Sequence, residues 1–385
     1  MHARILAQIE SVPAAQWNAL DLGGSPFLRY EFLAELEATR CVGRGTGWQP
    51  QHLLLESGGE LIGALPLYAK DHSWGEFVFD WSWARAYAQS NLEYYPKLVS
   101  MVPFSPVPSA RLLIRPGVDA SATRQALVAA LLRHAQEQRC SSAHVLFCHE
   151  ADLQALRDAG FLLRQDCQFH WHNHGFRTFD DFMATFRAEK RKKALRERRR
   201  VQEAGIRFDT LHGDEIDAQL WRTLFALSEN TFQTRGHEHY LSAEFFISIA
   251  AKLPRSVMVK LARLGEQCIA AAIFFRSDDT LYGRYWGSTA DFHSLHFETC
   301  YYQGIEYCIQ HGLQTFEPGT QGEHKVPRGF EPASTSSAHW IADRRFRRAI
   351  DDYLCQERAA INQYMTSIRE HVPFRRDLES REPQP

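Results

Sequence analysis

The segment from Glu317 to Pro332 carries the densest group of side chains able to do chemistry. Its sixteen residues include three glycines, three prolines and six ionisable side chains, so the segment cannot form a regular helix or strand. It follows an expected strand at 313–316, and ligand-binding loops gather at the carboxyl ends of strands in α/β sheets. A polar loop with fixed turns can direct side chains at a substrate. We favour this interpretation over a solvated surface loop.

An expected strand at 281–286 supports a site near this loop. Alternation along the strand places two sets of residues on opposite faces: Tyr282, Arg284 and Trp286 on one, and Gly283, Tyr285 and Gly287 on the other. Glycines in a strand indicate close approach by another group. The alternative is an aromatic sheet core with Arg284 at its edge.

The residues at 293–298 are predicted to begin a helix near the same strand end. They bring His293, His296 and Glu298 to that place, and the backbone amides at a helix start can bind an anion or a carbonyl oxygen. Ser294 is predicted to cap this helix.

A metal site is not predicted. His170, His172 and His174 would share one face of a strand, and three imidazoles are a ligand set that zinc accepts. No fourth ligand can be assigned, however, and Trp171 indicates a packed strand. The eight cysteines include no Cys-x-x-Cys pair, so we expect reduced and mostly buried thiols.

The stretch from Arg187 to Arg200 is strongly basic. It holds nine basic and two acidic residues, a net charge of +7, while the whole chain carries −2. No glycine or proline interrupts it before Gly205, so a helix of several turns is predicted. Two interpretations stay open: a solvated face packed against the acidic remainder, or a contact with RNA or another polyanion.

Length and composition predict a two-domain globular protein. The chain has 385 residues, of which 44% are hydrophobic and 23% are charged. It has neither the apolar core of a signal peptide nor a run of about 18 apolar residues, so we expect a cytoplasmic protein without membrane insertion.

The order of expected elements repeats once along the chain. A hairpin around Gly58 and Gly59 precedes a helix at 123–137 and a strand at 144–148. In the second half, strands at 257–262, 268–275 and 281–286 precede a helix whose buried stripe includes Tyr301, and then the strand at 313–316. This order predicts an α/β (α+β) fold with two lobes.

Three stretches of the second half resemble a bacterial family of N-acyltransferases of peptidoglycan biosynthesis or recognition. They are LYGRYWG at 281–287, LHFETCYY at 295–302, and QGEHK at 321–325 with RGF at 328–330. In the first half, SPFL at 25–28 and FSPVP at 104–108 agree with the same family. The family is similar in turn to the Fem-type aminoacyltransferases.

The resemblance implies two tandem GNAT-like acyltransferase lobes. The implied division is a first lobe at 1–170, a basic helical connector at 171–212, a second lobe with the active site at 213–342, and a C-terminal helix and tail at 343–385. Between Trp286 and Phe297 the sequence lacks the glycine-rich pyrophosphate loop of acetyl-CoA-dependent members. No cofactor is therefore assigned. An acyl-CoA and an aminoacyl-tRNA both stay open as donor, the tRNA lying on 187–200.

Acyl transfer to an amine, such as that of a cell-wall precursor, suggests roles for these residues. In this hypothesis Glu317 or Glu298 accepts the amine proton, with His324 as a second candidate base. Tyr282 or Tyr285 supplies a proton or a hydrogen bond. The predicted substrate-binding residues are Arg284, Trp286, His296, Gln321, Lys325 and Arg328, among which the cationic ones hold a phosphate or carboxylate. The alternative is a non-catalytic binding module for a cell-wall precursor or RNA.

Overall fold

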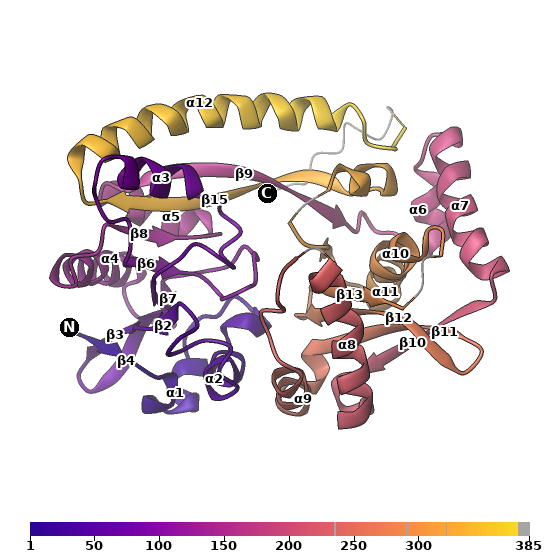
Figure 1. Cartoon of the computed structure of the whole chain (residues 1–385), viewed down its shortest axis with the longest axis horizontal. Coiled ribbons are helices and arrows are strands. Elements are labelled where there is room, and N and C mark those ends of the chain that lie inside the picture. Colours follow the sequence, from indigo (N-terminus) through magenta and orange to yellow (C-terminus); the bar gives the residue numbers. More distant parts are fainter. Residues whose placement is uncertain (235, 290–291, 321, 376–385) are drawn as a thin grey trace. The chain divides into compact units, whose positions relative to one another are not determined.

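The computed structural model describes residues 1–234, 236–289, 292–320 and 322–375 (Figure 1). The chain forms two compact units. The first comprises Met1–Asp166 and Ser334–Asn362, and the second comprises Cys167–Ala333 and Gln363–Pro385. The basic segment predicted as a connector at 171–212 thus belongs to the second unit.

The first unit contains two groups of paired strands. One has the order β1 (His2–Leu6), β3 (His52–Ser57), β4 (Glu60–Leu65), β7 (Leu113–Ile114). The other has the order β15 (Glu331–Ile341), β8 (Ser142–Val145), β6 (Lys97–Ser100), β5 (Tyr68–Lys70), β2 (Trp48–Pro50). The helices are α1 (Ala14–Asn18), α2 (Tyr30–Ala38), α3 (Trp81–Gln89), α4 (Ala120–Glu137) and α5 (Glu150–Asp158). The predicted hairpin is confirmed as β3 and β4.

Helix α4 joins the parallel strands β6 and β8. Its first turn is capped by the side chain of Asp119, which accepts a hydrogen bond from the backbone N–H of Ala122 at 3.0 Å. Its buried face, which includes Leu127 and Leu131, packs into the core of the unit. Parallel strands need such a crossover connection, whereas the hairpin strands do not.

The second unit is built around one run of strands. Their order is β10 (Ile206–His212), β11 (Val257–Leu264), β12 (Gln267–Arg276), β13 (Thr280–Ser288), β14 (Thr315–Glu317), β9 (Leu162–His172). The helices are α6 (Phe179–Ala184), α7 (Ala188–Glu203), α8 (Ala218–Thr234), α9 (Ala243–Lys252), α10 (Leu295–Phe297) and α11 (Gln303–His311), and α12 (Arg344–Arg369) ends in this unit.

Both units thus contain antiparallel strands followed by a parallel pair with a crossover helix. In the second unit, β10 to β13 are antiparallel, and α11 joins β13 to its parallel neighbour β14. The predicted two-lobed α/β architecture is confirmed. Within the residues that the structure describes, no helix is long and apolar enough to cross a membrane.

The basic stretch folds into α7, as predicted. Three of its residues, Ala194, Glu197 and Val201, are buried, at the spacing of one helical face. Gly205, with φ of 77°, lies just after the end of the helix, where a left-handed conformation is needed. The helix therefore buries a narrow stripe that includes one carboxylate.

Candidate active site

Strands β13 and β14 separate at Tyr282 and Glu317. Their parallel pairing covers only Thr280–Tyr282 and Thr315–Glu317, while β13 continues to Ser288 along β12. A Cβ atom on Gly283 would lie 3.2 Å from the Cα atom of Pro318, so the chain after β14 still touches β13 as it leaves the strand. Glu317 therefore lies where the two strands diverge, which we call the fork.

A β-bulge in β13 lies at the fork. Ile273 of β12 pairs with Tyr285 and Phe274 pairs with Gly283, so Arg284 is the extra residue of the bulge. Bulges redirect side chains and are frequent beside active sites. The sequence contains no local signal for this one, because the bulge is defined by pairing with β12.

The bulge makes the predicted alternation wrong. Leu281 packs in the core that contains Ile305 of α11, and Trp286 packs against the same core. Tyr285 instead contacts Phe246 of α9, with ring centroids 5.3 Å apart. Leu281 and Trp286 thus face the same core, on one side of the sheet. Tyr282 directly follows Leu281 and faces the other side, so Tyr282 and Trp286, which were predicted to share a face, lie on opposite faces of the sheet.

Glu317 is partly buried, and its surroundings favour the neutral carboxyl. Burial raises the pKa of Glu317 to about 8, although the charge of Arg284 acts in the opposite direction. Burial also lowers the pKa of Arg284, and burial followed by the charge of Glu317 raises the pKa of Tyr282. A carboxyl with this pKa is suited to exchange protons near neutral pH.

Lys325 is the second group at the fork with a strongly shifted pKa. Its side chain is buried, and Nζ donates a hydrogen bond to the backbone oxygen of Gly319 at 2.6 Å. Burial lowers the pKa of Lys325 to about 7, and the nearby charge of Arg284 adds to this effect. Glu317, Arg284 and Lys325 therefore form one group of interacting charges.

His324 and Tyr301 form a hydrogen-bonded pair beside this group. The Tyr301 hydroxyl lies 2.8 Å from Nε2 of His324. The ring of His296 lies 5.3 Å from the rings of both Trp286 and Tyr301, and 6.0 Å from that of His324. Partial burial, followed by the charges of Lys325 and Arg328, lowers the pKa of His324. Two predicted site residues, His296 and His324, thus contact Tyr301, and a third, Trp286, contacts His296.

The helix that carries Tyr301 is irregular at this place. Residues Glu298–Tyr302 form a π-helical turn between α10 and α11. Such turns are rare in proteins as a whole, and those that occur are often found at functional sites. The sequence indicated Tyr301 only as part of a buried helical stripe, which it also is, since the residue is buried.

Two predicted catalytic residues, Glu298 and Tyr285, make their contacts away from Glu317 and Lys325. The carboxylate of Glu298 accepts hydrogen bonds from Arg198 at 3.1 and 3.2 Å and from Gln303 at 2.8 Å. Tyr285 faces α9 and the ring of His239, at 5.0 Å between centroids. Glu317 and His324 therefore remain the better-placed candidate bases. Gln321 lies outside the described residues.

Arg328 is bound by the protein itself. It donates from Nε and Nη2 to Glu197 at 3.1 and 2.6 Å, and from Nη1 to the backbone oxygen of His324 at 2.5 Å. Its guanidinium also lies over the ring of Phe297, 3.3 Å from the centroid. The predicted contact with a substrate anion would have to compete with these partners. Glu197 was seen in the sequence only as one acidic residue of the basic run.

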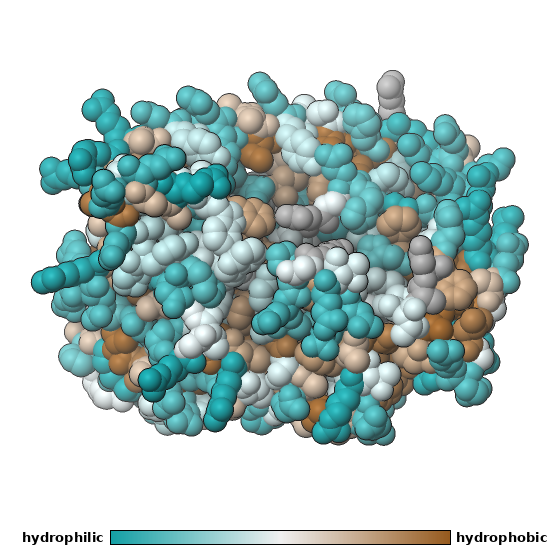
Figure 2. Space-filling view, in the orientation of Figure 1, coloured by the Kyte–Doolittle hydropathy of each residue, from teal (hydrophilic) through white to brown (hydrophobic). Residues whose placement is uncertain are grey.

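The outer face of α7 is basic and exposed. Five of its side chains share exposure and positive charge: Lys192, Lys193, Arg196, Arg199 and Arg200. Arg198 is turned inward to Glu298 and Glu306. Figure 2 shows hydrophilic side chains gathered where Figure 1 draws α7. The helix thus offers positive charge at its surface.

The corresponding place in the first unit is filled by protein. Strands β6 and β8 are parallel up to Ser100 and Val145, and Arg111 lies buried beyond them. Arg111 donates to the backbone oxygens of Leu146 and Val107 at 2.7 and 2.8 Å. The first unit has its own group of buried titratable residues on and beside β6, in which Nζ of Lys97 donates to Glu76 at 2.8 Å, but Arg111 and its carbonyl partners occupy the place beyond the parallel pair.

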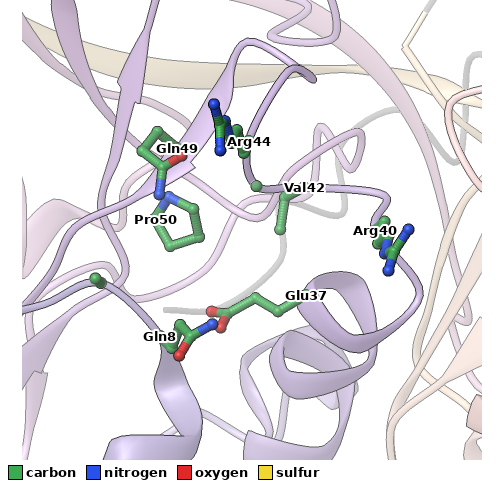
Figure 3. A pocket seen from close by; sticks show the side chains of 9 residues that line it. Gln8, Glu37, Arg40, Val42, Arg44, Gln49 and Pro50 are labelled. Atoms are coloured by element: carbon green, nitrogen blue, oxygen red, sulfur yellow. The ribbon is translucent and has the colours of Figure 1, made fainter.

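A hollow of about 460 Å³ lies elsewhere in the first unit (Figure 3). The side chains of Gln8 and Glu37 point toward each other in it. Glu37 accepts hydrogen bonds from the backbone N–H of Ile9 and from Nε2 of His52, both at 2.9 Å. Its carboxylate thus ties structural elements together.

A second hollow, of about 410 Å³, lies beside α8 and α9 in the second unit. It includes His239, whose Nδ1 accepts the backbone N–H of Leu241 at 3.1 Å. Nε2 therefore carries the proton and donates to Oγ of Ser228 at 3.0 Å, so this histidine cannot activate the serine as a base. Among residues 1–234, 236–289, 292–320 and 322–375, no three metal-ligating side chains cluster in a way that could hold an ion.

Comparison with known proteins gives one family and several related folds. Residues 8–376 match the profile of a family described as FemAB-like, peptidoglycan biosynthesis/recognition. The structure of FemX is similar, with 12% identity and a TM-score of 0.52 over 91% of this chain and 100% of FemX. L-PGS from Bacillus licheniformis is similar with 10% identity and a TM-score of 0.50, over 84% of this chain and 95% of that one.

A tandem GNAT protein from the clavulanic acid biosynthesis pathway has 12% identity and a TM-score of 0.44, over 89% of this chain and 98% of that one. No curated protein matches the sequence. At these identities the likeness to FemX and L-PGS shows the fold alone.

Proposed function

The chain belongs to the FemAB-like family of peptidoglycan biosynthesis and recognition, and we propose that its second unit transfers an acyl or aminoacyl group to an amine of a cell-wall precursor. The observation that carries this proposal is the fork between β13 and β14. There a carboxyl and an ammonium group, Glu317 and Lys325, both have a pKa shifted toward neutrality. Clusters of shifted pKa values in one place are typical of active sites.

Glu317 is proposed as the general base. As the amine nitrogen attacks the carbonyl carbon, a C–N bond forms and the nitrogen loses one proton to the carboxylate. The C–O or C–S bond to the donor then breaks, and the leaving oxygen or sulfur takes a proton. His324 and the hydroxyl of Tyr301, 2.8 Å apart, are the proposed proton source for this second step.

Arg284 and Lys325 are proposed to hold an anionic group of a substrate. Arg284 lies on the bulge and Lys325 is buried beside Gly319, so both charges lie in a partly desolvated place where attraction to a phosphate or carboxylate is strong. The fork of the first unit is filled by Arg111, which supports the second unit as the place of reaction.

Substitution at the fork tests the proposal. Glu317→Gln and His324→Ala are each expected to reduce turnover with folding intact. Glu323→Gln is a matched control, because this exposed carboxylate lies in the same segment but accepts a hydrogen bond from Tyr364 at 2.9 Å. Full activity in both variants would contradict the catalytic roles proposed for Glu317 and His324. Saturable precursor binding without turnover in the unsubstituted protein would instead favour a binding module.

The donor is proposed to be an aminoacyl-tRNA, with the exposed face of α7 as its contact. Clustered Lys and Arg side chains bind phosphates in a salt-dependent manner. Native purification followed by mass spectrometry of any retained ligand distinguishes the donors. A stabilising thermal shift with CoA and none with tRNA would contradict this choice.

A further inference from the structure

Glu197 lies at the centre of a buried hydrogen-bond network in the second unit. Oε2 accepts from the Tyr302 hydroxyl at 2.7 Å and from Nε of Arg328, and Oε1 accepts from Nη2 of Arg328. Glu197, Tyr302 and Arg328 are 7%, 0% and 5% exposed. Each carboxylate oxygen therefore has a donor, and both charges are paired away from water.

The network joins three separate segments of the chain. Glu197 comes from α7, Tyr302 ends the π-helical turn, and Arg328 ends the 3-10 helix Glu323–Arg328. Arg328 also donates to the backbone oxygen of His324, in the first turn of that helix. The same contacts thus fix the short helix that carries His324 and Lys325.

We infer that Glu197 is a positioning residue that, through Arg328 and Tyr302, holds His324 and Lys325 in place for the reaction. The inference rests on the proposed function, because that function gives His324 and Lys325 their catalytic roles. The contacts of Glu197 do not depend on it. Tyr301, which bonds to His324, directly precedes Tyr302 in the π-helical turn. The carboxylate of Glu197 therefore helps to orient Tyr301, through the neighbouring Tyr302, and His324, through Arg328.

Glu197→Gln tests this role while preserving the shape of the side chain. The amide removes the negative charge and presents N–H groups to Arg328, which is itself a donor only. Breaking one partner of a buried pair leaves the other charge uncompensated, so the 3-10 helix is expected to loosen. Glu306→Gln is the matched control. Glu306, in α11, also binds a basic residue of α7, since it accepts a hydrogen bond from Arg198 at 2.7 Å.

Hydrogen exchange measured by mass spectrometry gives the first readout. The backbone amides of Lys325, Gly329 and Phe330 are bonded within this segment. In Glu197→Gln they should exchange roughly tenfold faster at a temperature where the protein is folded, while Glu306→Gln leaves them unchanged. Equal exchange in Glu197→Gln and the unsubstituted protein overturns the inference. Because this readout needs no substrate, it is independent of whether acyl transfer is ever detected.

Arg328→Lys separates positioning from substrate binding. Lysine keeps the positive charge that an anionic substrate would need, but a single ammonium cannot reproduce the paired contacts with Glu197 and the His324 oxygen. A positioning role predicts a lower kcat with little change in KM, together with an altered NMR titration of His324. Full retention of kcat and of the His324 titration would overturn the role of this pair.

Discussion

The pH dependence of stability tests the surroundings of Glu317 without any substrate. Burial raises the pKa of this carboxyl from 4.5 to about 8, so between these values the folded chain keeps a proton that the unfolded chain loses. The corresponding contribution to stability is fully present below pH 4.5 and is lost as the pH rises through about 8. Glutamine does not titrate, so Glu317→Gln removes this dependence.

The expected size follows from the two pKa values. At about 1.4 kcal/mol per pH unit, the full interval corresponds to roughly 5 kcal/mol. Because Glu317 is partly buried, screening by water reduces this figure, and we expect about 2–4 kcal/mol between pH 5 and pH 8. The substitution should therefore stabilise the protein increasingly toward pH 8, relative to its effect at pH 5.

Urea denaturation followed by tryptophan fluorescence at pH 5, 6, 7 and 8 provides the measurement. Subtracting the free energies of unfolding of the two proteins cancels the titrating groups that do not interact with Glu317. Glu323→Gln, which replaces an exposed carboxylate of the same segment, is the matched control. A difference for Glu317→Gln that stays constant with pH would refute the burial of this carboxyl and its role as a base with a pKa near 8.

Other expectations follow from packing and charge. Gly287→Ala should destabilise the second unit by about 3 kcal/mol, because the added Cβ would lie 1.9 Å from the backbone oxygen of Leu227 in α8. Thermal or urea unfolding measures this loss, and an unchanged stability would contradict the close packing of Gly287 against α8. Arg111→Met should destabilise the first unit by about 3 kcal/mol, since it leaves two buried carbonyl oxygens without their donor, and calorimetry would show a loss confined to that unit. Replacing Lys192, Lys193 and Arg196 with glutamate should weaken tRNA binding and lower its salt dependence, and an unaltered salt slope would exclude the α7 face.

Local patterns predicted the elements of this fold well. The alternation around Gly58 and Gly59 gives the β3–β4 hairpin, and the absence of glycine and proline before Gly205 gives α7. These features depend on neighbours in the sequence, which is why composition and spacing are enough to find them.

The site was predicted less completely because its contacts are distant in the sequence. Glu197 and Arg328 are 131 positions apart, and Arg198 and Glu298 are 100 apart, so neither partner indicates the other locally. The bulge at Arg284 depends on the register with β12, and a one-residue shift reverses the face of each later side chain. Glu317, His324 and Lys325 were identified because turn residues and ionisable groups concentrate in their segment.

A transfer assay tests the central proposal most directly. The protein is incubated with a UDP-linked cell-wall peptide precursor and with either aminoacyl-tRNA or acetyl-CoA, and the precursor is weighed by mass spectrometry. The proposal predicts a precursor heavier by one aminoacyl group with the unsubstituted protein and with Glu323→Gln, and little or none with Glu317→Gln. Equal product with Glu317→Gln would contradict a reaction at the fork between β13 and β14.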